Sequence, residues 1–261
     1  FRVGQGSNQG SGLNHTALGF STTLNVDRFM PASGISLPVR LSVQHATDVP
    51  KFRTGSDVTL DASQSDIETR RFDQQTLDVT YRRSSSVRRG LMKYTLDAIS
   101  GTMSYTRRAS LNPQSAESSW AFSSGVGYDL PIGGGGFRLG KKFKVSLLPE
   151  VVGFNVGWTS TRALSYSREI FRDADSVALR SDLKVRLLAL GTTVSYVPFS
   201  SVRVQYALQS RRDMLFHQEG PLGFNKGKEV DKSQTASLNW TPRWLSFLQP
   251  NLTLKVQYSE A

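Results

Sequence analysis

The chain of 261 residues contains no cysteine, which excludes a disulfide framework, a thiolate nucleophile and a cysteine-bound metal. Apolar residues make up only 38% of it, below the ~45–50% of an average globular domain. No run of about 18 apolar residues is present, so the sequence offers no candidate transmembrane helix. A helical membrane protein and a disulfide-stapled secreted domain are both excluded.

Recognisable catalytic chemistry is also missing. The three histidines, His15, His45 and His217, are far apart and lack the carboxylate spacing of a metal site. The glycine run at 133–136 precedes Lys141, but no Ser or Thr follows a Gly-Lys pair at phosphate-loop spacing. No serine lies in a Gly-x-Ser-x-Gly elbow. We therefore predict no enzyme, no cofactor and no metal.

What the chain does contain is alternation with a period of two. Apolar residues repeat at every second position, and polar or small residues fill the positions between them. Successive side chains of a strand point to opposite faces, so each apolar set lies on one face. About ten segments show the pattern, centred on residues 18–26, 37–43, 77–81, 99–105, 120–128, 152–158, 183–196, 202–208, 236–240 and 252–258.

The segments are about 9–16 residues long, near the ~9–11 that a tilted strand needs to cross a bilayer. Strands of soluble proteins are shorter, at ~5–6 residues. The ten prolines fall at segment ends, as a hydrogen-bonded ladder requires. We predict an all-β fold, an antiparallel meander of about ten long strands forming an arc of a transmembrane β-barrel. Such a wall has one polar face, which explains the low apolar content.

Some details of the connections are predicted as well. From Leu183 the apolar set is odd-numbered and after Leu188 it is even-numbered, which predicts a β-bulge near Leu188. A short helix is possible within 57–71. Short connections are expected to alternate with long ones, as in outer-membrane barrels; the glycine-rich stretch 131–149 is long where a short turn is expected.

Charge is strongly positive, with 32 Lys and Arg against 21 Asp and Glu and a net charge of +11. Nucleic acid is not the expected partner, because the aromatics share the apolar phase and do not interleave with the basic residues. Lipid phosphates at a membrane rim and a basic pore lining are both open, and any single pair could simply be a solvated strand end. The candidate basic residues are Arg40, Arg82, Arg83, Arg107, Arg108, Lys184, Arg186, Arg203, Arg211 and Arg212.

Aromatic residues gather near the ends of the segments. An aromatic girdle at the membrane interfaces would produce this distribution, and so would the general preference of aromatics for strands. The candidate girdle residues are Phe29, Tyr105, Trp120, Tyr128, Trp158, Tyr196, Trp240, Trp244 and Tyr258.

Three stretches carry a family resemblance. They are Leu24–Pro31 with the Val49-Pro50-Lys51-Phe52 that comes after it, Ala98–Tyr105 with Asn112-Pro113, and Leu238–Pro242 with Trp244-Leu245. Together they resemble the barrel of the SprA family, the outer-membrane translocon of type IX secretion and gliding motility. The resemblance implies an exceptionally large barrel that conducts secreted protein cargo, with partner proteins that plug or cap the pore.

The chain is expected to be one unit, residues 1–261, and a fragment of a larger wall. It begins without Met or a signal peptide, and it ends on a strand-like segment. The expected function is a protein-conducting segment in the bacterial outer membrane, in contact with lipid or lipopolysaccharide and with the rest of the barrel. Two alternatives stay open. A complete small porin or lipopolysaccharide-transport barrel would close its first strand on its last, and a surface all-β binding module would pack its apolar faces into a dry core.

Overall fold

The computed structural model describes residues 2–7, 12–29, 34–52, 58–83, 95–133, 136–139, 143–169, 176–220, 225–241 and 250–260. These residues form one antiparallel sheet with very little helix. Its strands are β1 Arg2–Ser7, β2 Leu13–Asn25, β3 Ile35–Ser36, β4 Pro38–Pro50, β5 Arg70–Arg83, β6 Ile99–Leu111, β7 Ser115–Pro131, β8 Gly136–Leu139, β9 Phe143–Ser146, β10 Val151–Glu169, β11 Ser176–Phe199, β12 Val202–Asp213, β13 Lys228–Trp240 and β14 Leu252–Glu260.

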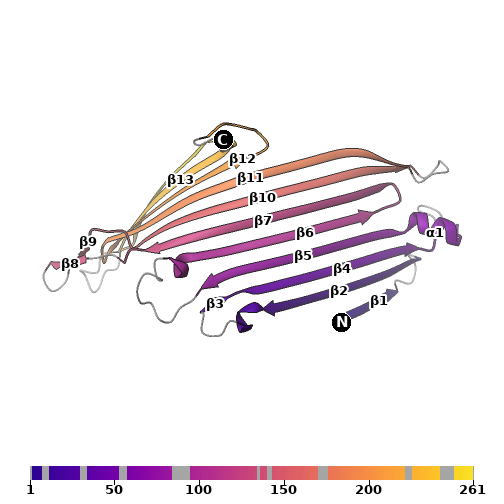
Figure 1. Cartoon of the computed structure of the whole chain (residues 1–261), viewed down its shortest axis with the longest axis horizontal. Helices are drawn as coiled ribbons and strands as arrows, with labels where there is room; N and C mark the ends of the chain where they lie inside the picture. Colours follow the sequence, from indigo (N-terminus) through magenta and orange to yellow (C-terminus); the bar gives the residue numbers. More distant parts are fainter. Residues whose placement is uncertain are drawn as a thin grey trace.

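The strands succeed one another across the sheet as a meander (Figure 1). The order is β1-β2-β4-β5-β6-β7-β10-β11-β12-β13-β14, and each strand is antiparallel to its neighbours. Off this path, β3 pairs with β5, and β8 and β9 form a hairpin that touches β11 through Val145 and Phe199. β1 and β14 are the two edges of the sheet.

The predicted meander is confirmed. Ten of the strands, β2, β4 to β7 and β10 to β14, are long, from nine residues in β14 to 24 in β11. Each contains one of the alternating segments. The sequence pattern missed β1 and the three short strands, because strands of two to six residues contain too few alternations to stand out.

The register joins the alternating sets into two continuous faces. Residues directly opposite one another in an antiparallel pair point to the same side. Starting from Phe154 in β10, one row passes through Tyr128 to Ile99 in one direction and through Thr192 to Leu208 in the other. We call the side that contains this row the apolar face and the opposite side the polar face.

The apolar face has no partner within the described part of the chain. Among the described residues, Ala98 is the one buried apolar residue, and no large side chain is fully buried. Phe20 is 57% exposed, Val126 56% and Leu254 59%. A soluble sheet would cover such a surface, since burial of apolar area is the main stabilising term in folding. The dry core that the binding-module alternative requires is therefore not formed.

The expected bulge near Leu188 is wrong. Leu187 and Leu188 stay in register with Thr159 and Trp158, and the shift occurs instead opposite Ser165 and Tyr166. The apolar phase changes because the outer half of β11 places leucines and valine on the polar face. In that half of the strand, charged residues occupy the positions on the apolar face. The alternation of apolar and polar residues is therefore inverted, although the backbone register does not change.

The connections agree only in part with expectation. A short helix, α1 Ala62–Glu68, lies between β4 and β5, and the Asp61 carboxylate caps it by accepting from the Gln64 amide at 2.8 Å. Loop length does not alternate from end to end, because residues 112–114 make a short turn at the α1 end of the sheet and 84–98 a long connection at the other. The long stretch 131–149 contains the β8–β9 hairpin.

Small residues give the polar face its shape. Gly125, Gly127, Gly153, Gly157 and Gly191 all lie on it, in adjoining rows of β7, β10 and β11. Two shallow hollows, of about 350 and 230 Å³, are lined mainly by residues of this same face. The polar face is therefore the concave side, and the glycines leave room for neighbouring side chains.

Gly191 provides a test of this crowding. A Cβ at position 191 would overlap the Asn155 amide, whereas a Cβ at Gly19, on the same face, would meet nothing within 4 Å. We expect Gly191→Val to lower the free energy of unfolding by about 1–3 kcal/mol through overpacking. Denaturant unfolding followed by tryptophan fluorescence measures the loss. Gly19→Val is the matched control, and Asn155→Ala should recover most of the loss; equal effects at both glycines would contradict the assignment.

Candidate functional site

Most apolar residues of the apolar face, exposed or half-buried, form a continuous strip, which we call the apolar belt; Val177 and Leu179 are exposed on the same face beyond it. It runs from Leu18–Leu24 in β2 to Leu252–Tyr258 in β14 and crosses every long strand between them. Its members include Leu18, Phe20, Leu24, Val39, Leu41, Val43, Leu77, Val79, Met103, Tyr105, Phe122, Val126, Tyr128, Val152, Phe154, Val156, Trp158, Leu188, Leu190, Val194, Tyr196, Val204, Tyr206, Leu208, Leu238, Trp240, Leu252, Leu254, Val256 and Tyr258.

The belt crosses the strands obliquely. The row that begins at Leu18 reaches β11 at Asp182, six residues short of the first belt residue there, Leu188. Leu188 faces Arg212 in β12. The belt margin in β12 is at Leu208, four residues from Arg212, and the row of Leu208 ends at Tyr258 in β14. This margin of the belt therefore moves by ten residues in nine strand steps.

The opposite margin moves by the same amount. The pairing row that begins at Leu24 reaches Leu188 in β11 and then Arg212 in β12. The belt margin in β12 is at Val202, ten residues from Arg212, and Val202 shares its row with Trp240 and Leu252. The belt thus keeps a constant height of seven residues at both ends of the sheet. Two parallel margins that drift together indicate one continuous strip and not scattered surface leucines.

The drift fixes the tilt of the strands from the direction perpendicular to the belt. Ten residues at ~3.3 Å each, over nine strand spacings of ~4.8 Å, give about 37°. Strands of outer-membrane barrels tilt by ~35–45° from the membrane normal. Seven residues at this tilt rise about 18 Å, and the side chains at both margins add to a height that compares with the ~25 Å apolar band of such barrels.

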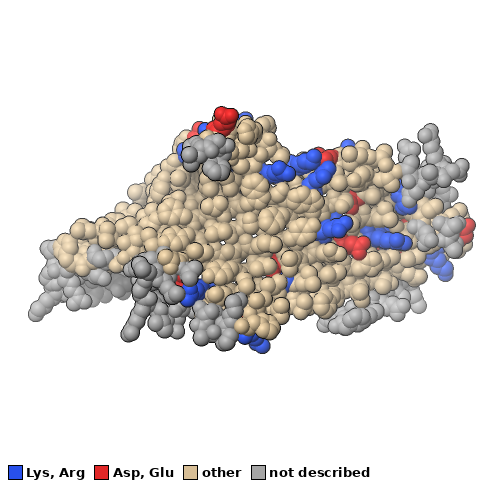
Figure 2. Space-filling model, in the orientation of Figure 1, with Lys and Arg blue, Asp and Glu red and all other residues tan. Residues whose placement is uncertain are grey.

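A row of basic residues borders the belt at the α1 end of the strands. Arg107 in β6 faces Trp120, Trp120 faces Arg162, and Arg162 faces Lys184, all on the apolar face. Arg186 and Arg212 continue the border along the oblique line, the latter opposite Leu188. We call Arg107, Arg162, Lys184, Arg186 and Arg212 the basic margin. In the view of Figure 2, Lys and Arg gather toward the α1 end of the central strands, and few charges lie elsewhere on that side.

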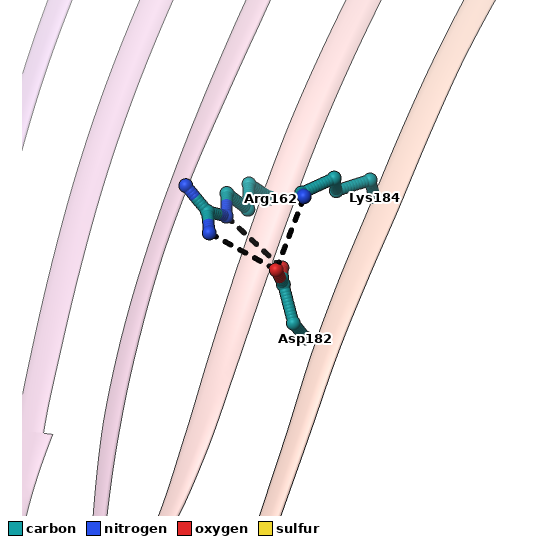
Figure 3. A network of polar contacts seen from close by, with 3 residues as sticks. All are labelled: Arg162, Asp182 and Lys184. Atoms are coloured by element: carbon teal, nitrogen blue, oxygen red, sulfur yellow. Dashed lines mark hydrogen bonds and ion pairs between the residues drawn. The ribbon is translucent and has the colours of Figure 1, made fainter. Parts of the chain in front are cut away.

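One carboxylate organises the centre of the basic margin (Figure 3). Asp182 accepts from Nε and Nη2 of Arg162 at 2.9 and 3.0 Å, and the Lys184 ammonium lies 3.2 Å from one of its oxygens. Nη1 of Arg162 has no bond to a described residue. Asp182 thus ties together cations from β10 and β11 and leaves donors of both free for a further partner.

The basic margin keeps an excess of positive charge. Arg212 is paired with Glu229 at 3.4 Å, so five cations face two carboxylates, a net charge of +3. Arg107 and Arg186 are exposed and have no ion pair with a described acidic residue. Solvated surface pairs add little stability, so the surplus has no evident role in holding the sheet together.

The ten basic residues singled out from the sequence divide between the two faces. Neighbours in a strand point to opposite sides, so each Arg-Arg pair splits. Arg107, Lys184, Arg186 and Arg212 lie on the apolar face at its charged margin, and Arg40, Arg82, Arg108, Arg203 and Arg211 lie on the polar face. Arg83 has the apolar-face parity at the other margin, 3.2 Å from Asp97.

The aromatics singled out from the sequence border the belt on both sides. Tyr105, Trp120, Trp158 and Tyr258 lie near the basic margin, whereas Tyr128, Tyr196 and Trp240 lie near the opposite one. Phe29, in the 3-10 turn Val26–Phe29 after β2, is 75% exposed. Trp244 lies outside the described residues.

Sequence reasoning missed Arg162 and Asp182, the best-defined polar contact in the basic margin. Neither is part of a basic pair, and neither was among the polar strand residues singled out from the alternation. A better signal was available: both have the even parity of the belt residues in their strands, Trp158 in β10 and Leu190 in β11. A charged residue that follows the belt residues of its strand at an even spacing lies on the same face as the belt, next to its edge.

The polar face carries small and hydroxylic side chains and no recognisable catalytic group among the described residues. Ser, Thr, Gly, Asn and Gln dominate it, and one imidazole, His15, contacts Asp48. His45 lies on the apolar face, 2.7 Å from Asp73. Within the described ranges no group of three or more His, Asp or Glu is placed to hold a metal. No helix in the described part of the chain is long and apolar enough to cross a membrane.

Comparison with known proteins gives little. No family model and no curated protein matches the chain. Among solved structures, the translocator domain of the autotransporter NalP from Neisseria meningitidis is similar over 95% of this chain and 75% of that one, with 10% sequence identity and a TM-score of 0.30. A score this low carries no weight for fold or function, so the functional proposal depends on the geometry of the chain itself.

One aromatic at the belt border also has a structural contact that can be tested. The Tyr196 hydroxyl donates to the carbonyl of Ser146 at 2.8 Å, and Ser146 is buried, so this bond ties β9 to β11. Tyr196→Phe should lower the free energy of unfolding by about 0.5–1.5 kcal/mol. The control is Tyr206→Phe, since the Tyr206 hydroxyl donates to Gln234 in an exposed hydrogen bond. Denaturant titration of both variants measures the difference, and a larger loss at Tyr206 would contradict it.

Proposed function

We propose that the chain is a segment of an outer-membrane β-barrel wall that forms part of a protein-secretion channel and has no enzymatic activity. One observation carries the proposal: an apolar belt of constant height crosses ten strands, which tilt by about 37° from the direction perpendicular to it. A belt of constant height across tilted strands fits a planar apolar environment. A bilayer is that environment, and tilted strands present a level band to it.

The two faces then have separate roles. The convex apolar face meets lipid, with Tyr, Trp and Phe at the belt borders as its interfacial girdle. The concave polar face meets water. Its Ser, Thr and Gly residues offer a passing polypeptide few deep pockets and little apolar area, so the contribution to transport is passive.

The specific system is inferred from the sequence resemblance. The motifs Leu24–Pro31, Ala98–Tyr105 and Leu238–Pro242 resemble the SprA family, and we propose a place in a type IX secretion translocon, with secreted cargo and pore-capping proteins as partners. The strand arc supports a large enclosure, since ten long strands have not brought β14 back to β1.

A complete small porin is the second candidate. It requires pairing between the first and last strands, and the sheet instead presents β1 and β14 as separate edges. All nine residues of β14 are exposed. The described strands therefore do not form the closed barrel that this candidate requires, and an open edge of this length can pair with another strand.

The membrane assignment predicts a requirement for detergent or lipid. The protein should be extracted with the outer-membrane fraction and stay monodisperse only with detergent, because its belt has no protein cover. Size-exclusion chromatography with and without detergent measures this. A folded, monodisperse protein in plain buffer would overturn the proposal.

A charge placed in the belt should be costly, and the same charge on the other face should not. Val126 lies in mid-belt in β7 and is 56% exposed, whereas Ser123 in the same strand is exposed on the polar face. We expect Val126→Arg to destabilise the lipid-inserted protein by about 2–4 kcal/mol and Ser123→Arg to have little effect. Urea titrations in lipid vesicles compare them, and equal losses would show that Val126 does not face lipid.

A further inference from the structure

We infer that the basic margin is a binding site for the phosphate groups of an anionic outer-leaflet lipid, of which lipid A is the representative. The inference rests on the proposed function, since it requires the belt to lie in a bilayer. It adds to that function a ligand class, a set of residues and an orientation of the strands.

The first ground is position. Arg107, Arg162 and Lys184 lie in one pairing row, and Arg186 and Arg212 lie where the oblique margin passes through β11 and β12. Three of the cations thus share a pairing row, and all five lie next to the α1 end of the belt in their strands. A ligand that contacts both must have an apolar portion and an anionic head next to it, which describes a phospholipid or lipid A.

The second ground is chemistry. Three of the five cations are arginines with donors to spare: Arg107 and Arg186 have no ion pair with a described acid, and Nη1 of Arg162 has no bond to a described residue. A planar guanidinium matches a phosphate with two parallel hydrogen bonds. Trp120, between Arg107 and Arg162 in the row, adds the aromatic type that prefers the headgroup level.

The third ground is preorganisation. Asp182 holds Arg162 and Lys184 through three contacts of 2.9–3.2 Å, so two long side chains are fixed before a ligand arrives. Fixing them in advance reduces the ordering entropy that binding must otherwise overcome. Asp182 is thus a positioning residue, and its negative charge is already counted in the net +3 of the margin.

The position of the margin along the strands gives their orientation. β10 continues from Trp158 at the belt border to Glu169, eleven residues further, and β11 covers twelve positions from Ser176 before Leu188. The strands thus project well past the basic margin. If the margin binds lipid A, this end of the sheet is the outer-leaflet end, and α1 lies on the cell surface.

The experiment is a binding titration of the full-length protein in detergent with lipid A in mixed micelles. The test variant is Arg107→Gln with Arg186→Gln. The matched control is Arg108→Gln with Arg211→Gln, which removes the same charge from exposed positions on the polar face. We expect the test pair to weaken lipid A binding by at least about tenfold, from two lost charge-assisted contacts, and the control pair to change it less than about twofold.

Asp182→Asn separates positioning from simple charge attraction. It makes the margin more positive, so unspecific attraction would strengthen binding, whereas loss of the fixed Arg162–Lys184 arrangement would weaken it. We expect weaker binding. Stronger binding with an unchanged Arg107/Arg186 effect would overturn the positioning role.

Three outcomes would overturn the lipid assignment. Equal effects of the two double variants would show unspecific attraction to net charge. Binding of inorganic phosphate that competes fully with lipid A would assign the site to a free anion. Unchanged lipid A binding together with loss of a co-purifying acidic protein would assign it to a protein partner. The proposed function fails separately, because a protein that needs no detergent is excluded from the membrane whatever its anion binding.

Discussion

The whole arrangement depends on register. A strand alternates its side chains with a period of two, so a slip of one residue anywhere between β2 and β14 would move every later apolar residue to the opposite face. The backbone ladder keeps the apolar set on one side across all nine steps, with irregularities near strand ends, at Ser165/Tyr166 in β10, Tyr196/Phe199 in β11 and Arg211/Arg212 in β12. Belt, margin and polar face are consequences of that continuity.

Register also explains how a chain with almost no core can form a defined sheet. Most of the contacts are between neighbouring strands. Among the described residues, the long strands inside the edges pair on both sides over most of their length, except the outer part of β11 before Leu187, which pairs with β10 alone. In water, the exposed belt would oppose this arrangement, since apolar area is left uncovered. In hydrocarbon the same area is favourable, and unpaired backbone groups become very costly. The structure is therefore consistent only with an environment that rewards backbone pairing and accepts apolar surface.

Much of the fold was predictable because alternation is local. The segment around Leu77–Tyr81 and the one around Leu252–Tyr258 each reveal a strand without knowledge of any other. The tilt was not predictable from the sequence. It depends on how far the apolar set of each strand is displaced along the strand from the apolar set of the next, and that displacement is known only once the strand pairing is known. The inverted outer half of β11 is misleading for the same reason: a change in parity at Leu188 can mean a bulge or a change of environment, and only the pairing with Thr159 and Trp158 distinguishes them.

The charge surplus shows how pairing changes the meaning of a sequence feature. Arg107-Arg108 and Arg211-Arg212 each look like a single basic spot, for which one partner would be sought. In a strand, adjacent residues lie on opposite faces, so each pair gives one arginine to the belt border and one to the concave side. Under the proposed function the two members meet different environments, lipid headgroups in one case and water in the other. A net charge of +11 thus describes no single binding surface, and the pairs record where strands cross the edge of the belt.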